Sequence, residues 1–162
     1  QKHSGDEKTL REKKASSAMS KRPPGTGVPL HNRALARVFE NLGGPTGGGR
    51  QRVRALLLEF YRRMTTDIML LHFFVDRDIA AIAEKQSEFL LRAMGAIPTY
   101  SGKAPADAHG ALPSILEGHF NRRLVLLRQV LLADGLSEAD ADAWVSFEDA
   151  FRGALVEGST AC

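Results

Sequence analysis

Apolar residues recur every three or four positions through most of this chain, and this helical spacing constrains its fold more than any other feature. The spacing places apolar side chains on one face of a helix, and that face must be buried against other helices. Gly and Pro interrupt the pattern at intervals and divide it into separate segments. Because no segment shows the sustained alternation of a half-buried strand, the sequence predicts an all-α fold.

The predicted helices follow from where the apolar spacing starts and stops. Gly43 and Gly44 end the first helix, since glycine accepts the left-handed backbone that terminates a helix. Ser137, with Asp140 three residues later, is the predicted N-cap of the last helix. The first predicted helix carries Leu35, Val38, Phe39 and Leu42, and the second runs from about Arg50 to Met64. The third carries Ile79 to Ala93 and ends at Gly95. The fourth runs from about Glu117 to Leu132, and the fifth carries Trp144, Phe147, Phe151 and Leu155. Phe73 and Phe74 lie in a predicted turn, and the segment with Pro98, Gly102 and Pro105 is predicted to be irregular.

The composition changes near residue 30. Residues 1–29 contain many Lys and Arg side chains among Ser, Asp and Glu but few large apolar ones, so they predict a disordered basic tail. Residues 30–158 form the predicted domain, and 159–162 are its C-terminal end. The net charge of +3 leaves open an electrostatic arm for nucleic acid or an anionic membrane. The uneven placement of the charge favours a solvated tail, and we predict neither partner.

Cysteine content bears on the compartment. The single cysteine, Cys162, excludes an internal disulfide, and we expect a protein of the reducing cytoplasm. No apolar stretch reaches the length of about 18 residues that a membrane span needs. Metal-binding cysteine pairs, an HExxH, a phosphate-binding loop and a GxSxG are all absent from the sequence.

Two uncharged polar side chains lie on apolar helix faces. Tyr61 follows Leu57 by four positions and Gln86 follows Ile82 by four, so both are expected to point into the core. A buried hydroxyl or amide without a partner costs about 1 to 3 kcal/mol, so each must find a polar group inside. The two groups either meet each other or meet a bound ligand in a pocket, although a core tyrosine that bonds a carbonyl is also common.

His109 differs from the other four histidines because it lies in a segment of small residues between two apolar helices. A lone histidine is more often a satisfied structural group than a metal ligand. Neutral imidazole is nevertheless the usual axial ligand by which a helical pocket holds haem iron. The residues alone leave both interpretations open.

The order of these residues resembles the truncated haemoglobins, a family with a two-over-two form of the globin fold, over Leu42 to about Leu155. The matching motifs, at spacings similar to those of the family, are Phe60-Tyr61, Phe73-Phe74, Lys85-Gln86-x-x-Phe89, Tyr100-Ser101-Gly102, His109 and His119-Phe120. The only tryptophan, Trp144, lies outside the helix that Phe120 opens, and this pattern is most similar to group I. The chain departs from the family in a longer loop from Pro45 to Gly49, in Ala96 where a second glycine is usual, and in one extra residue between His109 and Phe120.

The resemblance implies a haem b cofactor with His109 as the iron ligand. It also implies that Tyr61 and Gln86 donate hydrogen bonds to the bound gas. Lys85 is the expected partner of a haem propionate. The other expected cofactor contacts are Phe74, Ile82, Phe89, Tyr100, Ile115 and Phe120.

The function implied by the resemblance is reversible binding of oxygen, and of NO or CO, by a monomer or weak dimer. The gas would serve storage, sensing or detoxification of NO to nitrate. Whether the protein is an enzyme stays open, because NO dioxygenation would need a separate reductase. The alternative is a haem-free helical interaction or regulatory module that keeps the globin scaffold.

Overall fold

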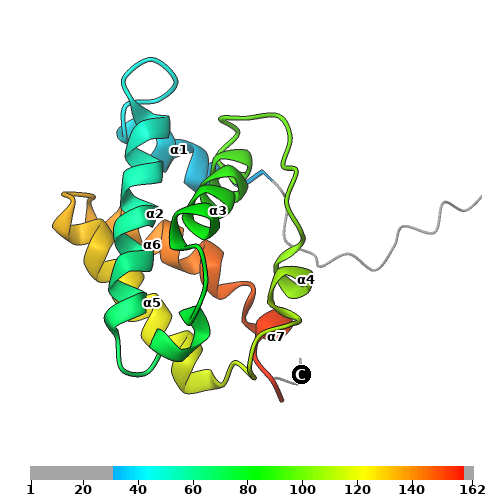
Figure 1. Cartoon of the computed structure of the whole chain (residues 1–162). Helices are drawn as coiled ribbons and strands as arrows, with labels where there is room; N and C mark the ends of the chain where they lie inside the picture. Colours follow the sequence, from blue (N-terminus) through cyan, green and yellow to red (C-terminus); the bar gives the residue numbers. More distant parts are fainter. Residues whose placement is uncertain (1–30, 159–162) are drawn as a thin grey trace, which may run out of the picture.

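Amphipathic helices form in the order that the apolar spacing predicts (Figure 1). The computed structural model describes residues 31–158, and this part of the chain contains no strand. The elements are α1 (Arg33–Asn41), α2 (Gly49–Thr66), the 3₁₀ turn η1 (Leu71–Phe74), α3 (Ile79–Ala93), α4 (Pro105–His109), α5 (Glu117–Ala133), α6 (Glu138–Asp149) and α7 (Arg152–Leu155). The predicted tail, residues 1–29, and the C-terminal end, 159–162, lie outside the described residues.

Side-chain caps fix where α1 and α6 begin. The Asn32 side chain accepts a hydrogen bond of 3.1 Å from the Leu35 backbone N–H at the start of α1. Ser137 Oγ accepts one of 3.1 Å from the Asp140 backbone N–H at the start of α6, which confirms the predicted cap. These bonds satisfy backbone donors that have no partner within the first turn.

The long glycine loop after α1 closes on itself. The Gly47 N–H donates to the Gly43 carbonyl at 2.8 Å, and Gly43 has a φ of 115°. A Cβ at Gly43 would collide with the Gly47 carbonyl, so only glycine fits there. The extra loop residues leave α1 packed against α6, where the Asn41 amide donates to Asp140 at 2.9 Å.

The structure corrects two sequence predictions. The segment predicted to be irregular contains α4, which begins at Pro105 because proline suits the first turn of a helix. The predicted last helix is divided into α6 and α7. At the break, the Phe151 N–H bonds the Glu148 carbonyl three residues earlier, at 3.1 Å, in place of the four-residue spacing of an α-helix. The break brings the Phe151 ring against Phe147 and Phe89, at centroid distances of 5.4 and 5.6 Å.

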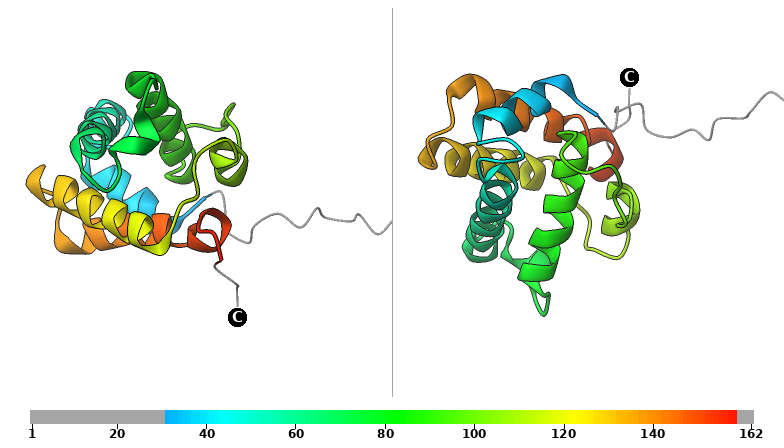
Figure 2. Two further views of the ribbon diagram at one scale, coloured as in Figure 1. Left: turned by 60° about the horizontal axis from the view of Figure 1, so that its bottom comes forward. Right: turned by 90° about the horizontal axis from the view of Figure 1, so that it is seen from above.

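Two helix pairs form the body of the domain. α2 packs on α3 and α5 packs on α6, while α2 also contacts α5, so that one pair lies over the other (Figure 2). The core between the pairs includes Phe60 and Trp144, both fully buried, and α1 covers it from the α6 side. α4 and α7 lie against each other beside the pairs. No helix within residues 31–158 is long and apolar enough to cross a membrane.

Candidate cofactor site

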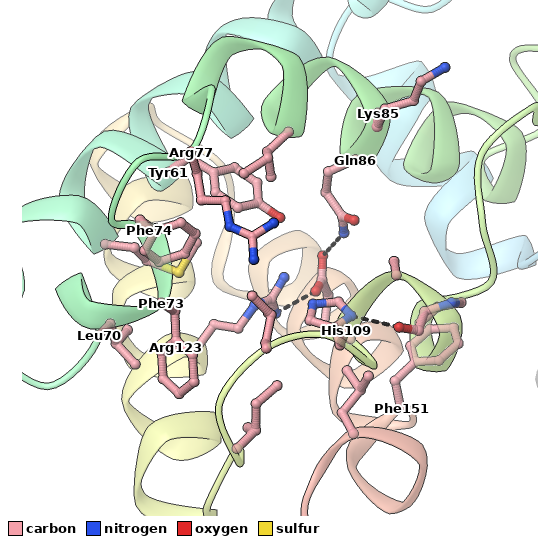
Figure 3. A pocket seen from close by; sticks show the side chains of 18 of the residues that line it. Tyr61, Leu70, Phe73, Phe74, Arg77, Lys85, Gln86, His109, Arg123 and Phe151 are labelled. Carbon is pink, nitrogen blue, oxygen red and sulfur yellow. Dashed lines mark hydrogen bonds and ion pairs between the residues drawn. The ribbon is translucent and has the colours of Figure 1, made fainter.

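A cavity of about 380 Å³ opens between the two helix pairs and the α4 segment (Figure 3). Its volume falls within the range of small-molecule and cofactor sites. All ten residues that the sequence places at the site line it: Tyr61, Phe74, Ile82, Lys85, Gln86, Phe89, Tyr100, His109, Ile115 and Phe120. The fold therefore brings these ten residues together around one cavity, although they are spread over 60 positions of the sequence.

His109 ends the short helix α4 and faces the cavity. Its Nδ1 lies 2.6 Å from the Pro105 carbonyl oxygen. Because a carbonyl only accepts, Nδ1 carries the proton and Nε2 keeps a free lone pair. Burial lowers the pKa of His109, against the opposing effect of the Pro105 hydrogen bond, so the ring is neutral at pH 7. A neutral imidazole oriented by a backbone carbonyl is the usual state of a metal-binding histidine.

Tyr61 enters the cavity from α2 and is almost fully buried. Its ring packs edge-on against Phe74, with centroids 6.0 Å apart, and tilted against Phe60 at 5.5 Å. Burial raises the pKa of the Tyr61 hydroxyl, and the positive charge of Arg123 only partly opposes this effect. The phenol therefore stays protonated at neutral pH and is able to donate a hydrogen bond.

Gln86 projects from α3 toward two charged residues that the sequence analysis did not identify, Arg123 on α5 and Glu148 on α6. Gln86 Nε2 donates to Glu148 Oε1 at 3.2 Å. Glu148 Oε2 pairs with Arg123 Nη1 at 2.5 Å. The Arg123 guanidinium also lies over the Phe60 ring, 5.1 Å from its centroid. Burial disfavours the charge on Arg123, but Glu148 and Tyr61 together outweigh this effect and the pKa of Arg123 is raised.

A signal for both charged residues was present in the sequence. Arg123 follows Phe120 by three positions and precedes Leu127 by four, and Glu148 follows Trp144 by four. Each therefore lies on the apolar face of its helix, as Gln86 does on α3. The rule that identified the uncharged Gln86 identifies both charges when it is applied to every polar residue type.

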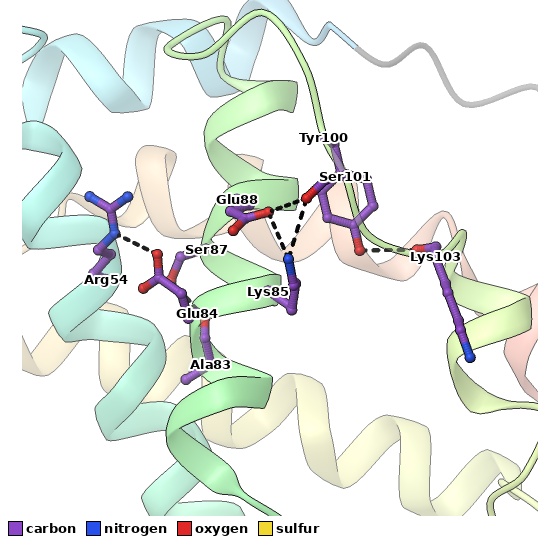
Figure 4. Close-up of polar contacts among 9 residues, drawn as sticks. All are labelled: Arg54, Ala83, Glu84, Lys85, Ser87, Glu88, Tyr100, Ser101 and Lys103. Carbon is purple, nitrogen blue, oxygen red and sulfur yellow. Dashed lines mark hydrogen bonds and ion pairs between the residues drawn. The ribbon is translucent and has the colours of Figure 1, made fainter.

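Polar residues on α3 and in the loop before α4 surround the outer part of the site (Figure 4). Lys85 Nζ lies 3.4 Å from Glu88 Oε2 and 3.3 Å from Ser101 Oγ, and its side chain is 55% exposed. The Tyr100 hydroxyl donates to the Lys103 carbonyl at 3.0 Å, and its ring meets Phe89 edge-on at 5.5 Å. Because more than half of its side chain is exposed, Lys85 is able to turn toward an anionic group at the cavity rim.

The residues present fit a haem. Within residues 31–158, no three His, Cys, Asp or Glu side chains are grouped to hold a metal ion by themselves. A macrocycle that brings its own metal needs only one or two protein ligands, and His109 offers one into the cavity. Apolar rings line the walls for the macrocycle, and the cations Lys85 and Arg77 also line the cavity for its carboxylates.

The fold and the site together define a globin-type domain, in which two crossed helix pairs enclose an apolar cavity with one inward histidine. The family model of the bacterial-like globins matches residues 37–156. The chain belongs to this family.

Curated relatives agree with this assignment. A group 1 truncated haemoglobin of Tetrahymena thermophila is 29% identical over 65% of this chain and 83% of its own length. The group 1 truncated haemoglobin GlbN of Synechocystis sp. is 33% identical over 48% of this chain and 59% of its own length. The predicted likeness to the truncated haemoglobins, and to group I among them, is confirmed.

One solved structure has the same fold. It is the 2/2 haemoglobin from Synechococcus sp. PCC 7002, determined in the cyanomet state with covalently attached haem. It aligns with a TM-score of 0.63 over 74% of this chain and 97% of that chain, at 23% sequence identity. The predicted all-α, two-over-two globin fold is confirmed.

Proposed function

We propose that this protein binds haem b through His109 and reversibly binds oxygen, NO or CO at the haem iron. The observation that carries the proposal is the neutral His109 imidazole, which is held at Nδ1 by the Pro105 carbonyl and faces a cavity that Tyr61 also lines. Membership of the bacterial-like globins and relatives named as haemoglobins support it. When bound, the haem supplies the iron that coordinates the gas.

The residues around the cavity have separate roles in this proposal. The protonated Tyr61 hydroxyl donates a hydrogen bond to a gas ligand that carries partial negative charge. Gln86 contributes its second amide N–H, since Glu148 accepts the first. Lys85 pairs with a propionate at the rim and Tyr100 closes the side next to Phe89. Water is excluded by an apolar wall made of Phe74, Ile82, Phe89, Ile115 and Phe120.

The use of the bound gas is a further part of the proposal. Among storage, sensing and conversion of NO to nitrate, the last requires electrons from a separate reductase, because haem iron must be reduced again after each turnover. The cysteine content of the sequence fits a protein of the cytoplasm, and we propose a monomer or weak dimer. Nitrate formed per NO consumed, with and without an added reductase, distinguishes conversion from storage.

The experiment that tests haem binding is a hemin titration followed by reduction and exposure to CO. The wild type is expected to bind one hemin per chain with a sharp Soret band that shifts with CO. His109→Ala is expected to lose this band or alter it. His72→Ala is the matched control, because His72 is a histidine that does not line the cavity.

A haem-free interaction module is the competing function. If the wild type binds no stoichiometric hemin, gas binding is excluded and the interaction module becomes the better account. If the His72 and His109 variants change the spectrum equally, the assignment of His109 as iron ligand is wrong.

A further inference from the structure

Two charged side chains connect the two residues that are proposed to donate hydrogen bonds to the gas. Arg123 Nη1 on α5 pairs with Glu148 Oε2 on α6 at 2.5 Å, and both side chains line the cavity. The other carboxylate oxygen, Glu148 Oε1, accepts a hydrogen bond of 3.2 Å from Gln86 Nε2 on α3. Gln86, Glu148 and Arg123 therefore form one chain of contacts between the two helix pairs (Figure 3).

Tyr61 extends this chain of contacts from α2. Burial raises the pKa of its hydroxyl, and the charge of Arg123 and a hydrogen bond from the Arg123 guanidinium oppose that effect. Arginine carries five N–H donors in a fixed planar fork, so one guanidinium is able to serve Tyr61 and Glu148 together. The guanidinium carbon lies over the Phe60 ring, 5.1 Å from its centroid, and this contact limits its movement.

The charges at the centre of the chain of contacts decide which way its two ends point. A guanidinium only donates, so the Tyr61 oxygen accepts from Arg123 and its own O–H must point elsewhere. An ionised carboxylate only accepts, so the NH₂ end of Gln86 must face Glu148 and its carbonyl end must not. Each end thereby keeps one hydrogen that the ion pair does not use, the Tyr61 O–H and the second Gln86 N–H.

We propose that Arg123 and Glu148 are positioning residues that orient Tyr61 and Gln86 as donors toward the gas ligand. This inference rests on the proposed gas binding, because the two donors act on a gas only when haem is present. Without the ion pair, the Gln86 amide could turn its carbonyl to the ligand, and the Tyr61 O–H could turn away from it. Arg123 and Glu148 keep their charges and each other throughout.

The C–O stretching frequency of bound CO tests this orientation, because each arrangement of donors and acceptors around the gas gives its own band. The probe is CO on the reduced haem protein, measured by infrared spectroscopy. The wild type is expected to give a single dominant band. The double variant Arg123→Met with Glu148→Leu removes both charges, so that no buried ion is left alone, and is expected to give several bands.

Oxygen dissociation provides a second measurement, which a merely structural role of the ion pair would leave unchanged. In the wild type, Tyr61→Phe is expected to raise the dissociation rate by about tenfold or more. In the double variant the same substitution is expected to raise it by about threefold or less, because the hydroxyl is no longer oriented. Gln86→Leu is likewise expected to have a smaller effect in the double variant than in the wild type.

A conservative variant keeps the test valid if the double variant does not fold. Arg123→Lys keeps a cation beside Glu148 but lacks the planar fork that serves two partners. It is expected to reduce the effect of Tyr61→Phe on oxygen dissociation. The effect of Gln86→Leu is expected to stay as in the wild type, because Glu148 remains ionised and in place.

Another ion pair supplies the matched control. Arg54 Nε on α2 pairs with Glu84 Oε1 on α3 at 3.1 Å, and neither side chain lines the cavity. The double variant Arg54→Met with Glu84→Leu also removes two opposite charges. It is expected to behave as the wild type in the infrared spectrum and in oxygen dissociation.

The outcomes separate this inference from gas binding itself. Equal effects of Tyr61→Phe in the wild type and in both Arg123 variants, with one CO band throughout, would overturn the positioning role. A normal CO-shifted Soret band in the same samples would leave the gas-binding function intact. If the reduced wild type shows no CO shift, the gas-binding function and this inference both fail.

Discussion

Gln86 on α3 and Glu148 on α6, 62 positions apart in the chain, are joined by a hydrogen bond of 3.2 Å from the amide nitrogen to a carboxylate oxygen. An ionised carboxylate only accepts hydrogen bonds, so the NH₂ end of the amide must face Glu148. The orientation of Gln86 in the cavity is thereby fixed by a residue on the opposite helix pair. Gln86 consequently has fewer donors for a gas ligand than an unpaired glutamine would have.

Tyr61→Phe is expected to raise the oxygen dissociation rate of the haem protein by about tenfold or more. The hydroxyl is buried and protonated, and loss of a hydrogen bond worth about 1.5 kcal/mol corresponds to that factor. Stopped-flow displacement of oxygen by CO measures the rate. The ring packing against Phe74 is kept in the variant, so an unchanged rate would show that the hydroxyl does not contact the ligand.

Gln86→Leu is expected to raise the same rate by a smaller factor, about threefold, since one of its two N–H groups is bound to Glu148. Such a factor corresponds to less than 1 kcal/mol, at the low end for a hydrogen bond. The same displacement experiment tests it. An effect larger than that of Tyr61→Phe would contradict the assignment of Tyr61 as the principal donor.

Glu148→Leu is expected to destabilise the haem-free protein by about 3 to 5 kcal/mol, because Arg123 stays buried without its partner. The double variant Arg123→Met with Glu148→Leu is expected to recover most of that loss. Urea unfolding followed by circular dichroism measures both values. A double variant that is no more stable than Glu148→Leu would show that the pair is not coupled.

His109 is expected to make the free energy of unfolding of the haem-free protein fall at acidic pH. Its pKa is lowered in the folded protein by burial, so between the folded value and about 6.5 the unfolded chain binds more protons than the native one. The free energy of unfolding therefore falls as pH drops below about 6.5 and stops falling from this cause below the folded pKa. Urea unfolding of the haem-free protein across this window is the measurement. His109→Leu should remove this part of the slope, and an identical slope in the variant would refute the contribution.

Most of the fold follows from the periodicity of apolar residues, because each long helix has a continuous apolar face. Val53, Leu57 and Phe60 on α2, for example, are all fully buried as predicted. Helix α4 has no buried residue and hence no such signal. The break between α6 and α7 depends on Phe151 packing on Phe89, which is 62 positions earlier in the sequence. A contact of that range cannot be read from local spacing.

The site could be predicted where a motif or a misplaced polar residue marked it. Tyr61, Gln86 and His109 carried such signals, and the structure places all three around one cavity. Arg123 and Glu148 belong to none of the quoted motifs. Their places on apolar helix faces mark them as buried, but not as partners of each other. Partnership across α5 and α6 is a property of packing, which a single sequence does not contain.

The position of α4 has a consequence for the order in which the molecule assembles. This five-residue helix lies against α7, more than 40 positions later in the chain, and carries no buried residue of its own. A contact with that sequence separation is slow to form, and α4 is too short to be stable before it exists. We therefore expect the segment with His109 to be the last part of the domain to become ordered. A nascent chain would then complete the proposed haem site only after α7 has left the ribosome.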